Sequence, residues 1–222
     1  MGNCSGITFI NHILILYLML KQNSELRAEA RAALTDKWVM AAIATLIYSA
    51  VVGGLSAIPV VGILILLLTL PIAYGYAIVI LDVFRGSDVN IGGLFDGFSD
   101  YGRIIGTKLL QAVYTVLWTL LLVIPGIIKY YSYAMTDFIL KDQPELANNG
   151  AIEKSMAMME GNKMKLFLLD LSFIGWAILC LFTLGIGYFF LQPYMQAAHA
   201  AFYEDLKAQA VEEVIVEGTV EI

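Results

Sequence analysis

The uncharged run over residues 38–81 is the strongest constraint on how this chain folds. These 44 consecutive residues contain no Asp, Glu, Lys, Arg or His. One helix of that length would measure about 66 Å, roughly twice the thickness of the hydrocarbon core of a bilayer. The run must therefore fold back, and residues 53–59 hold the glycines and the proline that interrupt a helix most easily. Two membrane-spanning helices are predicted, near residues 38–56 and 60–82.

Two further apolar intervals predict three more spans. Residues 109–128 carry no charge and have the length of one crossing. Residues 166–203 are interrupted only by Asp170 and His199, and we expect them to fold back at the two glycines within residues 184–187. The corresponding predicted spans lie near residues 105–124, 166–183 and 187–204.

A threefold repeat predicts the sixth span. In each copy a proline is followed by a mainly apolar segment and then by an acidic residue, a pattern typical of the returning arm of a hairpin. The three pairs are Pro71 with Asp82, Pro125 with Asp137, and Pro193 with Glu204. The second pair places a short span near residues 126–141.

Amphipathic stretches precede the three hairpins. Apolar residues share one helical face over residues 26–34 and 91–105, and less clearly over 152–159. We therefore predict an all-α, polytopic membrane protein with about six transmembrane helices. They form three hairpins, each preceded by an amphipathic interfacial helix.

The distribution of basic residues predicts the topology, because cytoplasmic loops carry most of the Lys and Arg of a membrane protein. With three hairpins, every Lys and Arg except Lys129 falls on the same side. Both termini are therefore expected in the cytoplasm, and the outer turns are expected to be short. The arm that holds Lys129 is short, so we expect either a tilted or a re-entrant helix from which the lysine reaches the outer interface.

The two ends of the chain lie outside this pattern. Residues 1–18 lack the basic start and the cleavage pattern of a signal peptide, and two interpretations stay open: translation begins at Met19, or the segment lies at the interface. Residues 19–206 form the single membrane domain. In the acidic tail, residues 207–222, apolar and polar residues alternate, which predicts a strand; without a partner strand the tail is expected to be flexible in the cytoplasm.

Composition and motifs argue against several classes of function. The chain is 59% hydrophobic and only 14% charged, and it has no basic face for nucleic acid. The two cysteines, Cys4 and Cys180, and two histidines do not indicate a disulfide framework or a metal site, and no cofactor is predicted. No common hydrolase, P-loop or dinucleotide-binding motif occurs, and nothing near Ser172 predicts an oxyanion hole. We therefore expect that the protein is not an enzyme.

Asp170 and His199 are the candidate intramembrane polar pair. Each lies five residues from a charged residue at the cytoplasmic end of its span, so in an antiparallel hairpin the two side chains could meet. Such a pair can relay protons or bind a cation, or it can be a hydrogen bond that fixes helix packing. Three acids that end the returning arms are candidates for a ring at the cytoplasmic mouth, or for ordinary solvated boundaries: Asp82, Asp137 and Glu204.

Several segments resemble a known family. One is Ile124-PGIIKYYSYAMTDFIL, and the two more specific ones are Leu169-DLSFIGWAIL with Thr183-LGIG, and Pro193-YMQAAHAAFYEDL. Over about residues 25–206 the chain resembles the bacterial integral membrane family catalogued as domain of unknown function 975. The resemblance implies a multi-pass protein of the bacterial cytoplasmic membrane, more distantly similar to membrane regions attached to some glycerophosphodiester phosphodiesterases. It implies no catalytic residues.

Three functions follow as hypotheses. The first is a non-enzymatic structural or regulatory protein, because the spans carry almost no charge. The second is a small-solute or ion transporter or channel that uses Asp170 and His199. The third is a membrane partner of a soluble enzyme. The expected partners are the lipid bilayer and either further copies of the chain or another membrane protein.

Overall fold

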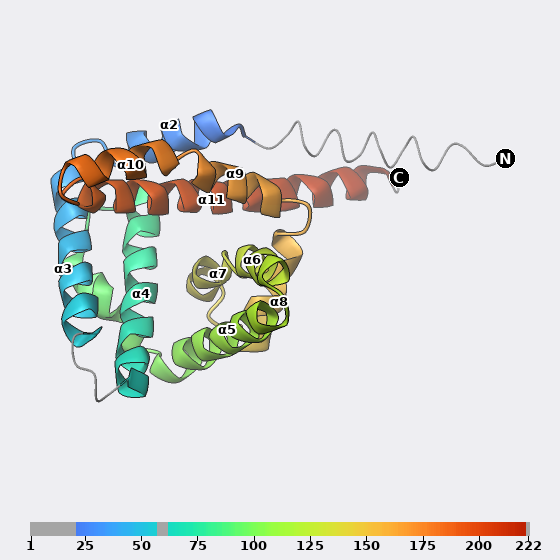
Figure 1. Cartoon of the computed structure of the whole chain (residues 1–222). Coiled ribbons are helices and arrows are strands. Elements are labelled where there is room, and N and C mark those ends of the chain that lie inside the picture. The colour runs from blue at the N-terminus through green and yellow to red at the C-terminus, as the bar shows by residue number, and fades with distance from the viewer. Residues whose placement is uncertain (1–20, 57–61, 221–222) are drawn as a thin grey trace.

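The computed structural model describes residues 21–56 and 62–220, which are helical with no strand among them (Figure 1). The expectations for residues 1–18, and for the turn at 57–61, lie outside these ranges. The elements are α2 (Asn23–Ala33), α3 (Trp38–Ser56), α4 (Gly62–Phe84), the 3-10 helix η1 (Ile91–Phe98), α5 (Tyr101–Leu121), α6 (Val123–Ser132), α7 (Thr136–Asp142), α8 (Asn149–Met158), α9 (Lys163–Leu171), α10 (Ile174–Phe182) and α11 (Tyr188–Val220).

The helices of the three predicted hairpins pack as neighbours: α3 on α4, α5 on α6, and α10 on α11. In Figure 1, α3 and α4 run beside each other, and α11 crosses one end of this pair with α2 alongside. Within the residues that the structure describes, three stretches are long and apolar enough to cross a membrane: Leu67–Phe84, Tyr101–Leu121 and Lys163–Phe182. The pair α2 and α3, bent by 95°, makes a fourth if it counts as one span.

The surface of the molecule suits lipid better than water. Large apolar side chains on α5, α6 and α10 point outward, including Leu120 at 78% and Phe182 at 81% of full exposure. Contiguous apolar surface of this kind marks a membrane or protein interface. The core lies instead around the second half of α4 and the middle of α11, where residues such as Ile80 and Phe202 are completely buried.

The segment predicted as one span near residues 126–141 is divided into α6 and α7. The Ser155 hydroxyl from α8 fills the break: it donates to the Ser132 carbonyl at 2.9 Å and accepts from the Met135 N–H at 3.2 Å. A side chain inserted in this way replaces the helical hydrogen bonds of the backbone. At 10 residues, α6 is about 15 Å long, which is too short to cross a bilayer alone.

Two predicted amphipathic helices differ from expectation. The apolar face of α2 packs within the protein, because Leu26, Ala30 and Leu34 are completely buried and α2 lies against α11. The stretch expected as one helix over residues 91–105 begins with η1, which packs tightly on α4. Its Leu94 is buried, whereas Phe95 is exposed.

The acidic tail differs as well, since α11 continues as a helix to Val220 and no strand forms over residues 207–220. Extending an existing helix costs little, because only nucleation of the first turn is unfavourable. The segment is also rich in Ala, Glu and Val, and the propensities of Ala and Glu favour helix over the alternation that predicted a strand.

Candidate functional site

Asp170 and His199 are in direct contact. The His199 Nε2 lies 2.6 Å from the Asp170 Oδ1, and the Tyr131 hydroxyl donates a hydrogen bond to the other carboxylate oxygen at 3.0 Å. Asp170 belongs to α9, His199 to α11 and Tyr131 to α6. The side chains of Asp170 and His199 are each 23% exposed. Three helices therefore meet at one carboxylate.

The position of Asp170 in its helix explains why it needs these donors. It lies in the last turn of α9, where the negative end of the helix dipole disfavours a carboxylate. An ionised carboxylate only accepts hydrogen bonds, so the His199 Nε2 is the donor in this contact when Asp170 is ionised. The two donors offset the unfavourable position of Asp170.

A small cavity of about 180 Å³ adjoins this contact. Its polar lining comes from α5, α6, α7, α9 and α11, and includes Lys108, Gln111, Asp137, Asp170, Gln196 and His199. The Gln111 amide nitrogen donates to the Tyr133 carbonyl at 3.3 Å. The Gln111 side-chain oxygen is buried and accepts no hydrogen bond from the described part of the chain. It is therefore a buried acceptor without a donor beside the cavity.

The cavity does not have the donor set of a metal site. In the described ranges no group of three or more His, Cys, Asp or Glu side chains could hold a metal ion. Its lining offers hydrogen-bonding groups, among them two carboxylates that already have partners.

The three candidate mouth acids do not form a ring of free carboxylates. Each has its own basic partner: Asp82 with Lys141 at 3.3 Å, Asp137 with Lys108 at 2.9 Å, and Glu204 with Arg85 at 2.6 Å. Of the three, Asp137 lines the cavity beside Asp170. These acids therefore connect helices by ion pairs.

Asp142 is the acid that the sequence did not single out. Arg85 donates two hydrogen bonds to its carboxylate at 2.8 and 2.7 Å, and the Tyr203 hydroxyl and Lys207 ammonium add donors at 3.0 and 2.7 Å. Burial raises the pKa of Asp142, but the hydrogen bonds from Arg85 and Lys207 outweigh burial and lower the pKa to about 2. The hydrogen bonds that Arg85 donates to Asp142 also raise the pKa of Arg85, although burial opposes this.

No local signal identifies this cluster. Asp142 follows Lys141 at the end of α7, and its partners Arg85 and Lys207 lie 57 and 65 residues away in the sequence. Tyr131 was missed for a similar reason, because a tyrosine in an apolar segment more often marks the edge of a membrane than a hydrogen bond to a distant acid.

Comparison with known proteins supports one relationship. No curated protein and no solved structure matches the chain significantly. A family model described as "Protein of unknown function (DUF975)" matches residues 60–210, which is more than half of the chain. Residues 60–206 of this match belong to the segment over which the sequence resembles this family. The chain belongs to the DUF975 family.

Proposed function

We propose that this protein is a non-enzymatic, integral component of the bacterial cytoplasmic membrane with a structural or regulatory role. Its six predicted crossings form three hairpins, with both termini in the cytoplasm. The helices that are long and apolar enough to cross a membrane support this proposal, as do the exposed apolar faces of α5, α6 and α10.

Contacts between the predicted cytoplasmic loops support the topology. Basic residues of one loop repeatedly bind carboxylates or carbonyls of another, which is expected if all of these loops lie on one side. The contacts are Lys37 Nζ with the Ser87 carbonyl at 2.6 Å, Arg85 with Asp142 at 2.7 Å, Arg103 with the Leu146 carbonyl at 3.1 Å, and Lys207 with Asp142 at 2.7 Å.

Lys129, the one basic residue outside the charge pattern, also lies beside these loops. Its ammonium is 3.8 Å from the Met156 sulfur on α8 and 5.2 Å from the centre of the Trp118 ring. Because α8 belongs to the basic segment between α7 and α9, this contact does not support the expected position of Lys129 at the outer interface.

The observation that carries the proposed role is the occupation of both Asp170 oxygens by side chains of other helices. A polar residue among apolar helices is costly unless it is paired, and paired residues hold helices together. The contact of Asp170 with His199 and Tyr131 thus acts as a connection between α6, α9 and α11.

The Asp170→Asn variant tests this role. It keeps the shape of the side chain but removes the charge and one acceptor, so we expect the free energy of unfolding in detergent to fall by roughly 1–3 kcal/mol. Asp88→Asn is the matched control, because Asp88 is exposed and forms no ion pair within the described ranges. The thermal midpoint should drop for Asp170→Asn and stay unchanged for Asp88→Asn.

Transport is the second candidate function, favoured by the polar lining of the cavity beside Asp170 and His199. Proteoliposomes that hold a pH gradient distinguish the two functions. A structural protein leaves the gradient as stable as in protein-free vesicles. Proton leakage through the native protein that disappears in folded Asp170→Asn would overturn the structural proposal.

A further inference from the structure

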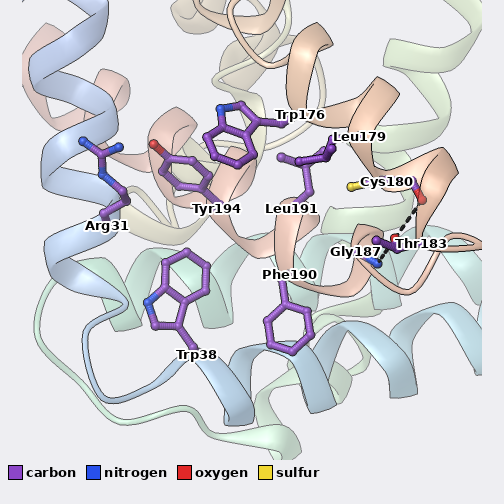
Figure 2. A pocket seen from close by; sticks show the side chains of 10 residues that line it. All are labelled: Arg31, Trp38, Trp176, Leu179, Cys180, Thr183, Gly187, Phe190, Leu191 and Tyr194. Atoms are coloured by element: carbon purple, nitrogen blue, oxygen red, sulfur yellow. Dashed lines mark hydrogen bonds between the residues drawn. The ribbon is translucent and has the colours of Figure 1, made fainter.

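An apolar cavity of about 350 Å³ lies between the α2–α3 bend and the α10–α11 hairpin (Figure 2). Aromatic and aliphatic side chains form most of its wall, contributed by three separate parts of the chain. Of the residues that line it, Arg31 is the one with a charged side chain. The cavity is within the range of about 300–1,000 Å³ that is typical of ligand pockets.

The side chains change in character along the cavity. In Figure 2, Arg31 lies at one end, and the Tyr194 hydroxyl is directed toward it. Trp38 and Trp176 follow, and Phe190 lies farther from the guanidinium, among the apolar residues at the other end. The cavity therefore has a cationic end and an apolar end, the order of groups that fits an amphiphile with a negatively charged head.

The Arg31 guanidinium has no protein partner within the described ranges, although its side chain is exposed. Arg27 lies one turn earlier in α2, and its buried Nε also lacks a hydrogen-bond partner there. A guanidinium binds phosphate through two parallel hydrogen bonds, and basic pockets between membrane helices bind anionic lipid head groups. Unpaired arginine at the mouth of an apolar cavity is the charge complement of such a head group.

We propose that this cavity binds one anionic phospholipid, with the phosphate on Arg31 and an acyl chain between α10 and α11. The acyl chain of the lipid covers Leu179 and Phe190, which are otherwise exposed. The inference goes beyond the proposed function. It holds whether the Asp170–His199 contact serves structure or transport, because the cavity shares no lining residue with that contact.

Tryptophan fluorescence measures occupation of the cavity directly. Two of the three tryptophans, Trp38 and Trp176, line it, and Trp118→Phe removes the third, which lies on α5. The full-length protein in a neutral detergent is titrated with phosphatidylglycerol or phosphatidylcholine whose acyl chains carry bromine, a contact quencher. We expect the anionic lipid to quench the tryptophan fluorescence at a roughly ten-fold lower concentration than the zwitterionic lipid does.

Two variants separate a specific site from general attraction. Arg31→Gln removes an exposed side chain without a protein partner, so it should fold normally and lose the preference for the anionic lipid. Lys154→Gln removes a positive charge from an exposed position on α8, and Lys154 does not line the cavity. This variant should keep the preference for the anionic lipid. Equal quenching by both lipids in the native protein, or an unchanged preference in Arg31→Gln, would overturn the proposal.

Discussion

The Asp142 carboxylate accepts four hydrogen bonds from three residues. Its carboxylate accepts hydrogen bonds from Arg85, Tyr203 and Lys207, and so connects the segment after α4 to α7 and α11. These donors stabilise the ionised form, which is why its pKa lies well below the ordinary value of 3.8. Removing the charge would leave the Arg85 guanidinium with Glu204 as its remaining carboxylate partner.

Asp142→Asn should therefore lower the free energy of unfolding at neutral pH by roughly 1–3 kcal/mol. Because folding lowers the pKa of Asp142, its stabilising effect is complete above pH 4 and is lost as the pH falls through about 2. The thermal midpoints of native and variant protein in detergent should accordingly converge between pH 4 and 2. Glu145→Gln, a change at an exposed acid in the next loop, should match the native protein throughout.

Single residues differ in how far the sequence predicts their contacts. The proximity of Asp170 and His199 follows from their equal distance from the cytoplasmic end of one hairpin, which is local information. The partners of Asp142 and the role of Ser155 depend on how separate hairpins pack against one another. Nothing in the neighbouring sequence carries that information.

The backbones of η1 and α4 lie very close to each other. A side chain at Gly75 would overlap the Leu94 carbonyl, and one at Gly97 would overlap the Pro71 carbonyl. Glycine is therefore required at these positions because the two backbones lie in contact.

Gly75→Ala should separate η1 from α4 and lower the free energy of unfolding by about 1–3 kcal/mol. Gly102→Ala is the control, since a side chain there meets no atom within 4 Å. In an exposed helix that change should instead add about 0.5–1 kcal/mol of stability, because alanine loses less backbone entropy than glycine. Thermal unfolding in detergent measures the stability of both variants. An unaltered midpoint for Gly75→Ala would contradict the close packing of η1 on α4.

Helices bounded by local signals were predicted well, and those bounded by distant contacts were not. The span expected near residues 38–56 corresponds to α3, which begins directly after the charged residues Asp36 and Lys37 and continues through Gly53 and Gly54 to Ser56. The break between α6 and α7 depends on a serine from α8, and therefore has no signature in its own segment. The tail shows a different limit. Its alternating apolar and polar residues predicted a strand, but the preceding helix α11 continues through it.

In the molecule as a whole, the loops that carry lysine and arginine lie together and bind one another. Charge distribution predicted that they share one side of the membrane, and the contacts that join them give this prediction physical support. The number of crossings is harder to predict, because the length of an apolar run does not distinguish a helix that crosses from one that re-enters.

Labelling of single cysteines with a membrane-impermeant maleimide tests the topology most directly. Cys4 and Cys180 are first replaced by serine, and one cysteine is then introduced at Glu145, between α7 and α8, or at Ile186, between α10 and α11. We expect Ile186→Cys to react in intact cells, and Glu145→Cys to react only after the cytoplasmic membrane is permeabilised. Reaction of Glu145→Cys in intact cells would contradict the cytoplasmic position of the basic loops.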